Sequence, residues 1–161
     1  MNLDLYSDRA KQAIQSAQSL ALARRHQQFA PEHLLKVLLE ERDGLARNLI
    51  TAAGGDAAKA ETATETALKK RAQVSGGSGQ LYLDGDTARV FATAEAASKA
   101  AGDAFVTTER LLAALATEGG VAAEVLKSCG VTARALDAAV VDLRKGKTAD
   151  SAGAEDAYHA L

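Results

Sequence analysis

The residues of this 161-residue chain that are best suited to chemistry are few and scattered. Gly146-Lys147-Thr148 matches the last three residues of a phosphate-binding loop. That motif also needs a glycine five residues earlier, where the chain has Val141, and it should follow a strand. The segment before Gly146 is instead predicted to be helical. We therefore expect no nucleotide site and no bound cofactor in this chain.

The histidines and the cysteine show no spacing typical of a metal site. The histidines are His26, His33 and His159, and Cys129 is the only cysteine. His33 follows Glu32 at a predicted helix start, where a solvated or capping role is the simplest interpretation. Cys129 precedes a helix-ending glycine and is interpreted as a small buried apolar residue. We expect no metal and no catalytic residue, although a small helical enzyme using Glu32, His33 or Cys129 stays open as an alternative.

Composition limits the class of protein. Hydrophobic residues are 47% of the chain, charged residues 25% and aromatic residues 4%, with one proline, which favours a globular helical fold. The formal net charge of −2 gives no strong attraction to nucleic acid or anionic membranes. A lone cysteine fits a reducing compartment, and no apolar run approaches the roughly 18 residues of a membrane span. The start lacks a signal peptide, so we expect a cytoplasmic protein with no nucleic-acid or membrane partner.

Helical patterns in the chain occur twice. The stretch 28–39 matches the stretch 105–116 after a shift of 77 positions. The shift aligns Glu32 with Glu109, Leu34 with Leu111, Leu35 with Leu112 and Leu38 with Leu115. A duplicated helical unit favours a scaffold that presents a surface over a single catalytic centre.

Capping residues and apolar spacing predict four helices in each copy. In the first copy they begin after Ser7, at Pro31, near Leu45 and after Asp56, and the first and fourth end near Arg25 and Ala72. In the second copy they lie around Val90, after Thr107, around Val125 and after Thr132, and the glycines Gly54 and Gly130 close the third helices. The prediction is an all-α domain over 1–145, with about eight helices in two pseudo-repeats of a four-helix unit, at about 5–72 and 84–145.

Two segments lack an apolar period. The stretch 74–79 has the composition of a flexible connector between the repeats. From 146 the chain is predicted to be a polar linker, and 155–161 has the pattern of a new element. We expect the chain to be a piece of a longer protein.

The repeated motif resembles the Clp N-terminal repeat domain. The hallmark stands as Phe29-Ala30-Pro31-Glu32-His33-Leu34-Leu35 and again as Phe105-Val106-Thr107-Thr108-Glu109-Arg110-Leu111-Leu112. The resemblance extends from about Leu3 to Lys145. The start 1–4, the connector 72–79 and the tail 153–161 are similar to those of the disaggregase branch of the family.

This resemblance implies a parent that is a hexameric ring AAA+ ATPase, with ATP and Mg bound outside this part of the chain. The parent would respond to stress by pulling polypeptides from aggregates with the DnaK chaperone system. The present part, a monomer by itself and not an enzyme, would capture exposed apolar stretches of unfolded or aggregated polypeptides. The alternative is docking of an adaptor protein, as in relatives that are protease-associated unfoldases.

The resemblance also implies a set of residues that contact clients. They are Ser7, Val90, Phe91, Asp103, Val106, Glu109 and Arg110. Asp103 and Glu109 would form an acidic rim that favours basic clients. Each position has a structural interpretation beside this one, since Ser7 has the character of an N-cap and Phe91 that of a core residue. Arg110 departs from the family, where an apolar residue or histidine is common.

Overall fold

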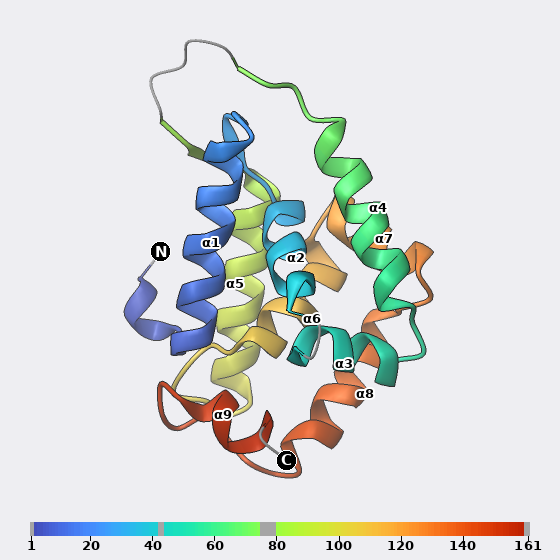
Figure 1. Cartoon of the computed structure of the whole chain (residues 1–161). Helices are drawn as coiled ribbons and strands as arrows, with labels where there is room; N and C mark the ends of the chain where they lie inside the picture. The colour runs from blue at the N-terminus through green and yellow to red at the C-terminus, as the bar shows by residue number, and fades with distance from the viewer. Residues whose placement is uncertain (1, 42–43, 75–79, 160–161) are drawn as a thin grey trace.

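The computed structural model describes residues 2–41, 44–74 and 80–159 of the chain, and Figure 1 shows their arrangement. The helices are the 3-10 turn Leu3–Leu5, α1 (Asp8–Ala23), α2 (Pro31–Glu40), α3 (Leu45–Ala52), α4 (Ala57–Lys69), α5 (Gly85–Ala100), α6 (Thr108–Glu118), α7 (Val121–Ser128), α8 (Ala133–Arg144) and α9 (Ala154–His159). Two strands of two residues each, β1 (Gln28–Phe29) and β2 (Tyr82–Leu83), complete the described part. The predicted all-α class, with four helices in each copy, is confirmed.

Most predicted helix starts are correct, and their caps explain why. The side chains of Ser7, Asp56 and Thr132 each accept a hydrogen bond from the backbone amide three residues further on. Thr107 precedes α6 as expected, but its hydroxyl makes no capping hydrogen bond and instead accepts one from Arg144 Nη2 at 3.1 Å. The first and fourth helices end at Ala23 and Lys69, slightly earlier than predicted.

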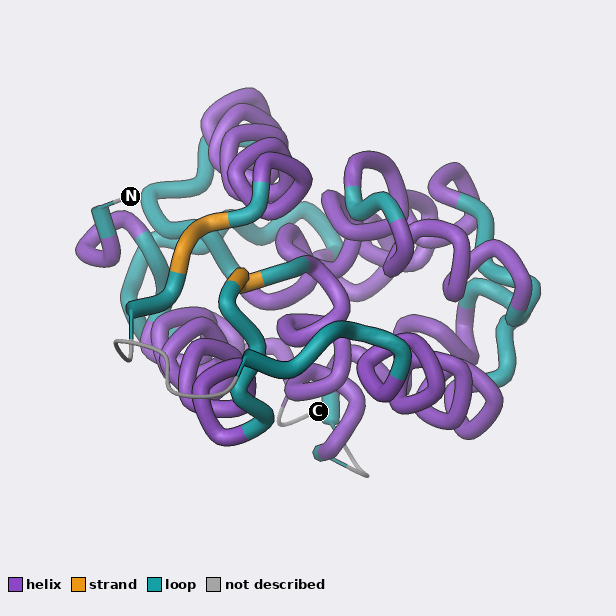
Figure 2. Tube along the Cα trace, turned by 90° about the horizontal axis from the view of Figure 1, so that it is seen from above, coloured by secondary structure: helices purple, strands orange, loops and turns teal. Residues whose placement is uncertain are grey.

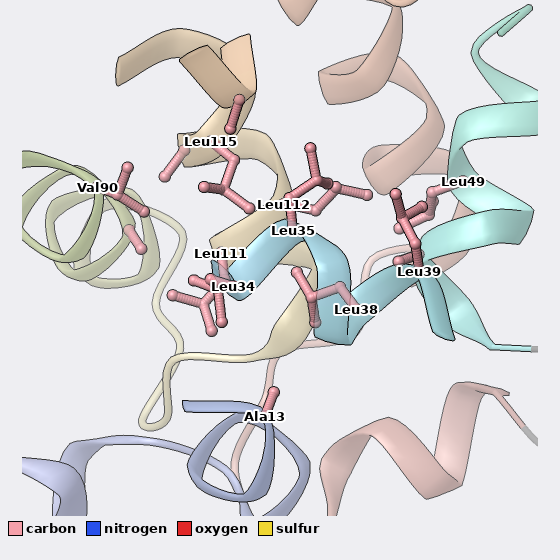
Figure 3. Packing of buried hydrophobic residues seen from close by; sticks show 14 of the residues in the cluster. Ala13, Leu34, Leu35, Leu38, Leu39, Leu49, Val90, Leu111, Leu112 and Leu115 are labelled. Carbon is pink, nitrogen blue, oxygen red and sulfur yellow. The ribbon is translucent and has the colours of Figure 1, made fainter. Parts of the chain in front are cut away.

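The core forms where the duplicated motif packs against itself. Helices α2 and α6 contact each other at the centre, with α1 against α2 and α5 against α6. The aligned leucines of the two motifs lie in one buried cluster, shown in Figure 3 (Leu34, Leu35, Leu111 and Leu112). The spacing of apolar residues along both helices therefore predicted the centre of the fold.

Short strands link the two repeats reciprocally. Phe29, just before α2, pairs with Leu83, just before α5, and Figure 2 shows these strands side by side. Tyr6, just before α1, forms a bridge with Val106, just before α6. The pairs are equivalent, because Tyr6 and Leu83 are 77 positions apart and so are Phe29 and Val106. Each repeat thus supplies a strand to the other.

The segment after Lys145 does not extend away as the predicted linker would. Ala149 is fully buried, and its carbonyl oxygen accepts hydrogen bonds from the amides of Ala104 and Phe105 at 2.9 and 3.2 Å. The amide of Asp8 donates to the carbonyl oxygen of Ala152 at 2.8 Å. These backbone bonds, which no apolar pattern reveals, hold the segment and α9 against the domain (Figure 1). The domain and repeat boundaries themselves stay predictions.

Candidate functional site

Two of the predicted client-contacting residues meet at the guanidinium of Arg144, near the end of α8. Its Nη1 and Nη2 donate to the two carboxylate oxygens of Asp103 at 2.9 and 3.0 Å, and its Nε donates to Glu109 Oε2 at 2.7 Å. Arg110 Nε adds a bond of 3.1 Å to Asp103 Oδ2. The side chains of Asp103 and Glu109 are 0% exposed. The expected exposed acidic rim is instead a buried ion-pair network.

Electrostatics agree with this arrangement. Burial alone would raise the pKa of Asp103, but hydrogen bonds from Arg144 and from the amide of Ala149 hold that pKa below its ordinary value. A bidentate guanidinium–carboxylate pair is a strong charge-assisted contact. Asp103 is therefore ionised and neutralised within the protein, so it contributes little negative charge toward a client.

The predicted apolar residues Val90, Phe91 and Val106 are buried as well. The ring of Phe91 packs edge-on against Tyr6 with centroids 6.0 Å apart, and it lies 6.1 Å from the ring of Phe29. These residues therefore belong to the core between the repeats in this conformation. Their role in contacting clients stays a prediction.

Ser7 is completely buried and lies where the C-terminal segment packs on the domain. Its amide donates to the carbonyl oxygen of Val106 at 2.9 Å, and its hydroxyl accepts the amide of Ala10 and faces the carboxylate of Glu155. Glu155 Oε2 accepts the amide of Thr108, the first residue of α6, at 2.8 Å. Sequence reasoning missed Glu155 and Arg144, because their partners lie 47 and 35 residues away.

The first repeat carries a different pair at the equivalent place. His26 and His33 align with Asp103 and Arg110 after the shift of 77 positions. His26 Nδ1 lies 2.8 Å from His33 Nε2, and His33 Nδ1 accepts the amide of Ala30 at 2.9 Å. A backbone amide can only donate, so the neutral ring of His33 carries its proton on Nε2, toward His26. The capping role expected for His33 is confirmed, but the ring is buried rather than solvated.

Burial, with smaller contributions from the charges of His26 and Arg71, lowers the pKa of His33 to about 4. Burial also lowers the pKa of His26. Both rings are neutral at pH 7. Within the described ranges no three His, Cys, Asp or Glu side chains gather as a potential metal site, and no described helix is long and apolar enough to cross a bilayer.

Several open grooves lie on the surface of the described residues, and two of them are lined by residues from both repeats. One, of about 490 Å³, lies between α1, α2 and α3 and is bordered by charged residues that include Arg9 and Asp156. The other, of about 760 Å³, runs between α4 of the first repeat and α7 of the second. It is lined by Glu32, Ala63, Thr66, Ala67, Lys70, Arg71, Val121, Glu124, Val125 and Ser128. This groove was not predicted from the sequence; Val121, at the start of α7, is an exposed apolar residue of its lining.

Known families and proteins resemble this chain along most of its length. The family described as the Clp repeat (R) N-terminal domain matches residues 5–129. The chaperone protein ClpB of Mesorhizobium japonicum is 54% identical over all of this chain, and that of Rickettsia felis is 39% identical. The chain covers only 19% of the length of each of these relatives.

Solved structures share the fold. The Hsp104 N-terminal domain from Candida albicans superposes with a TM-score of 0.83 at 19% identity, over 92% of this chain and 97% of that one. The N-terminal domain of ClpD from Arabidopsis thaliana gives a TM-score of 0.63 at 23% identity, over 88% and 98% of the two chains. At these identities the likeness concerns the fold alone.

Proposed function

This chain belongs to the Clp repeat (R) N-terminal domain family, and from that premise we propose that it is the client-capturing N-terminal module of a ClpB-like, ATP-dependent disaggregase. The observation that carries the proposal is the 54% identity to ClpB along the whole chain, which matches only 19% of that much longer protein. The longer protein would be a cytoplasmic hexameric AAA+ ATPase. Its other parts would hold ATP and Mg and cooperate with the DnaK system. The present chain would bind unfolded or aggregated polypeptides.

Capture of clients is best supported at the groove between α4 and α7. Its walls come from different repeats, so it lies where the two packed units meet. Alanine and valine side chains form its apolar part, where Val121 is 43% exposed, and polar and charged side chains such as Glu124 line the rest. The small apolar side chains favour weak contact with extended apolar segments and little sequence preference, because apolar contact is non-directional. Val90, Phe91 and Val106 are instead buried by packing between the repeats.

The test compares two exposed valines. Val121→Gln removes apolar surface from the groove, whereas Val141→Gln removes it from the outer face of α8, where Val141 is 69% exposed and does not line the groove. Binding of a permanently unfolded, carboxymethylated protein is followed by backbone amide NMR shifts, with the folded form of the same protein as reference. Loss of the valine contact should weaken binding severalfold, about 1 kcal/mol of burial, in the first variant only.

Each result has a definite meaning. Shifts along α4 and α7 that appear only with the unfolded protein, and that Val121→Gln weakens, support the proposal. Equal weakening by Val141→Gln would remove the groove as the site. Absence of any shift with unfolded chains would refute client capture, and binding of a folded partner alone would favour the adaptor-docking alternative.

A further inference from the structure

The C-terminal segment sits in a socket made by residues from both repeats. The carboxylate of Glu155 accepts the first amide of α6, from Thr108, and faces the hydroxyl of Ser7. Asp103 Oδ1 accepts the amide of Ala149 at 2.9 Å, and Arg144 Nη1 reaches the carbonyl oxygen of Lys147 at 3.3 Å. The socket is therefore complementary to one carboxylate and one stretch of backbone.

Small apolar side chains of the C-terminal segment are also buried against the domain. Ala149 is 0% exposed and Ala154 is 7% exposed, so both contribute to the apolar core although they lie outside the predicted repeats. Their methyl groups bury little surface compared with a leucine, and the apolar contribution to docking is correspondingly small. The docked state depends mainly on polar contacts.

One of these polar contacts, that of Glu155, includes an unfavourable contribution to the free energy of docking. Glu155 is 0% exposed, and its Oε1 accepts no hydrogen bond from any described residue. Burial raises the pKa of Glu155, the charge of Glu109 raises it further, and the donors at Ser7 and Thr108 only partly offset this. An ionised carboxylate in this place weakens docking relative to a neutral group of the same shape.

We propose that residues 147–156 form a detachable clasp that holds the exit of the chain against the domain and is kept weak by the buried carboxylate of Glu155. With the clasp closed, the chain leaves the domain in the fixed direction of α9. With the clasp open, the polypeptide after Lys145 becomes a flexible tether. In this proposal, Ser7 and Asp103 hold the clasp closed, whereas the family resemblance gives them the role of contacting clients.

Three substitutions in the whole chain test the clasp. Glu155→Ala removes the acceptor of the Thr108 amide, and Glu155→Gln keeps an acceptor without a charge. Asp142→Asn is the matched control, because Asp142 is an exposed acid on α8, outside residues 147–156. The measurement is amide hydrogen exchange by NMR at Ala104, Phe105 and Asp8, whose amides donate to the clasp segment.

Glu155→Ala should lower protection of these three amides about tenfold, while amides in the middle of α2 keep theirs. Glu155→Gln should raise protection, and Asp142→Asn should leave it unchanged. A peptide with the sequence of residues 146–161, added to Glu155→Ala, should restore protection, and the same peptide with alanine in place of the glutamate should not.

Two outcomes overturn the proposal. Loss of protection across α2 in Glu155→Ala would make the segment an inseparable part of the fold, and unchanged or lower protection in Glu155→Gln would show that the charge does not weaken docking. No client is present in these measurements, so their failure leaves the proposed client capture untouched.

Discussion

The buried histidine pair leads to a pH dependence of stability that can be worked out in advance. His33 is neutral in the folded domain because burial lowers its pKa to about 4, whereas an unfolded chain has the ordinary value of 6.5. Between these values the unfolded chain binds a proton that the folded domain does not. The contribution of His33 is therefore fully present above pH 6.5 and is lost as the pH falls toward 4.

The size of the effect follows from the difference in pKa. Each unit corresponds to 1.36 kcal/mol, so the free energy of unfolding should fall by up to about 3 kcal/mol between pH 7 and pH 4. Carboxylates with a lowered pKa add to the loss: Arg24 and Lys36 bring the pKa of Glu65 to about 2, mostly affecting stability below pH 4.5. The raised pKa of Glu155 acts in the opposite direction.

The assay is urea unfolding at pH 7.0, 5.5 and 4.5, followed by circular dichroism. His33→Asn is the matched variant, because the side-chain oxygen of asparagine can accept the Ala30 amide in place of Nδ1 while position 33 no longer titrates. The variant should be less stable at pH 7.0 through lost packing but should lose about 2 kcal/mol less between pH 7.0 and 4.5. Equal losses in both proteins would refute the reasoning.

Three further substitutions probe packing and charge. Arg144→Met removes the guanidinium facing two buried acidic side chains and should cost about 3 to 5 kcal/mol in urea unfolding, more than an exposed Arg→Met change. Gly55→Ala should cost more than 1 kcal/mol by thermal unfolding, since its methyl would lie 2.3 Å from Val131 Cγ2. Tyr6→Phe removes the hydroxyl that donates to Glu95 Oε2 at 2.5 Å and should lower stability by about 1 to 2 kcal/mol, whereas an unchanged urea midpoint would contradict that bond.

Structural features that are determined by residues close together in the chain could be predicted from the sequence. The leucines of α2 and α6 repeat at helical spacing, so the core and the helix order follow from periodicity alone. The cap at Ser7 follows from neighbouring residues in the same way. Causes of this kind act within a few positions of the chain.

Long-range contacts escaped prediction. Arg144 is an ordinary last-turn cation by sequence, and only the fold brings Asp103 and Glu109 to it. Residues 147–156 have the polar composition of a linker, yet backbone hydrogen bonds dock them, and those leave no mark on composition. The client-contacting role of these residues therefore stays a prediction, and their burial was not predicted.

The reciprocal strands have a consequence for how such a domain arises. A chain with a single repeat would carry two short strands without partners, equivalent to those at Tyr6 and Phe29. Two such chains complete each other when each inserts its strand into the other, as the Tyr6–Val106 and Phe29–Leu83 pairs do here. That is the geometry of a two-fold homodimer with exchanged strands, now joined into one polypeptide. In one polypeptide the two halves need not be identical, and here one holds a neutral histidine pair where the other holds an ion pair.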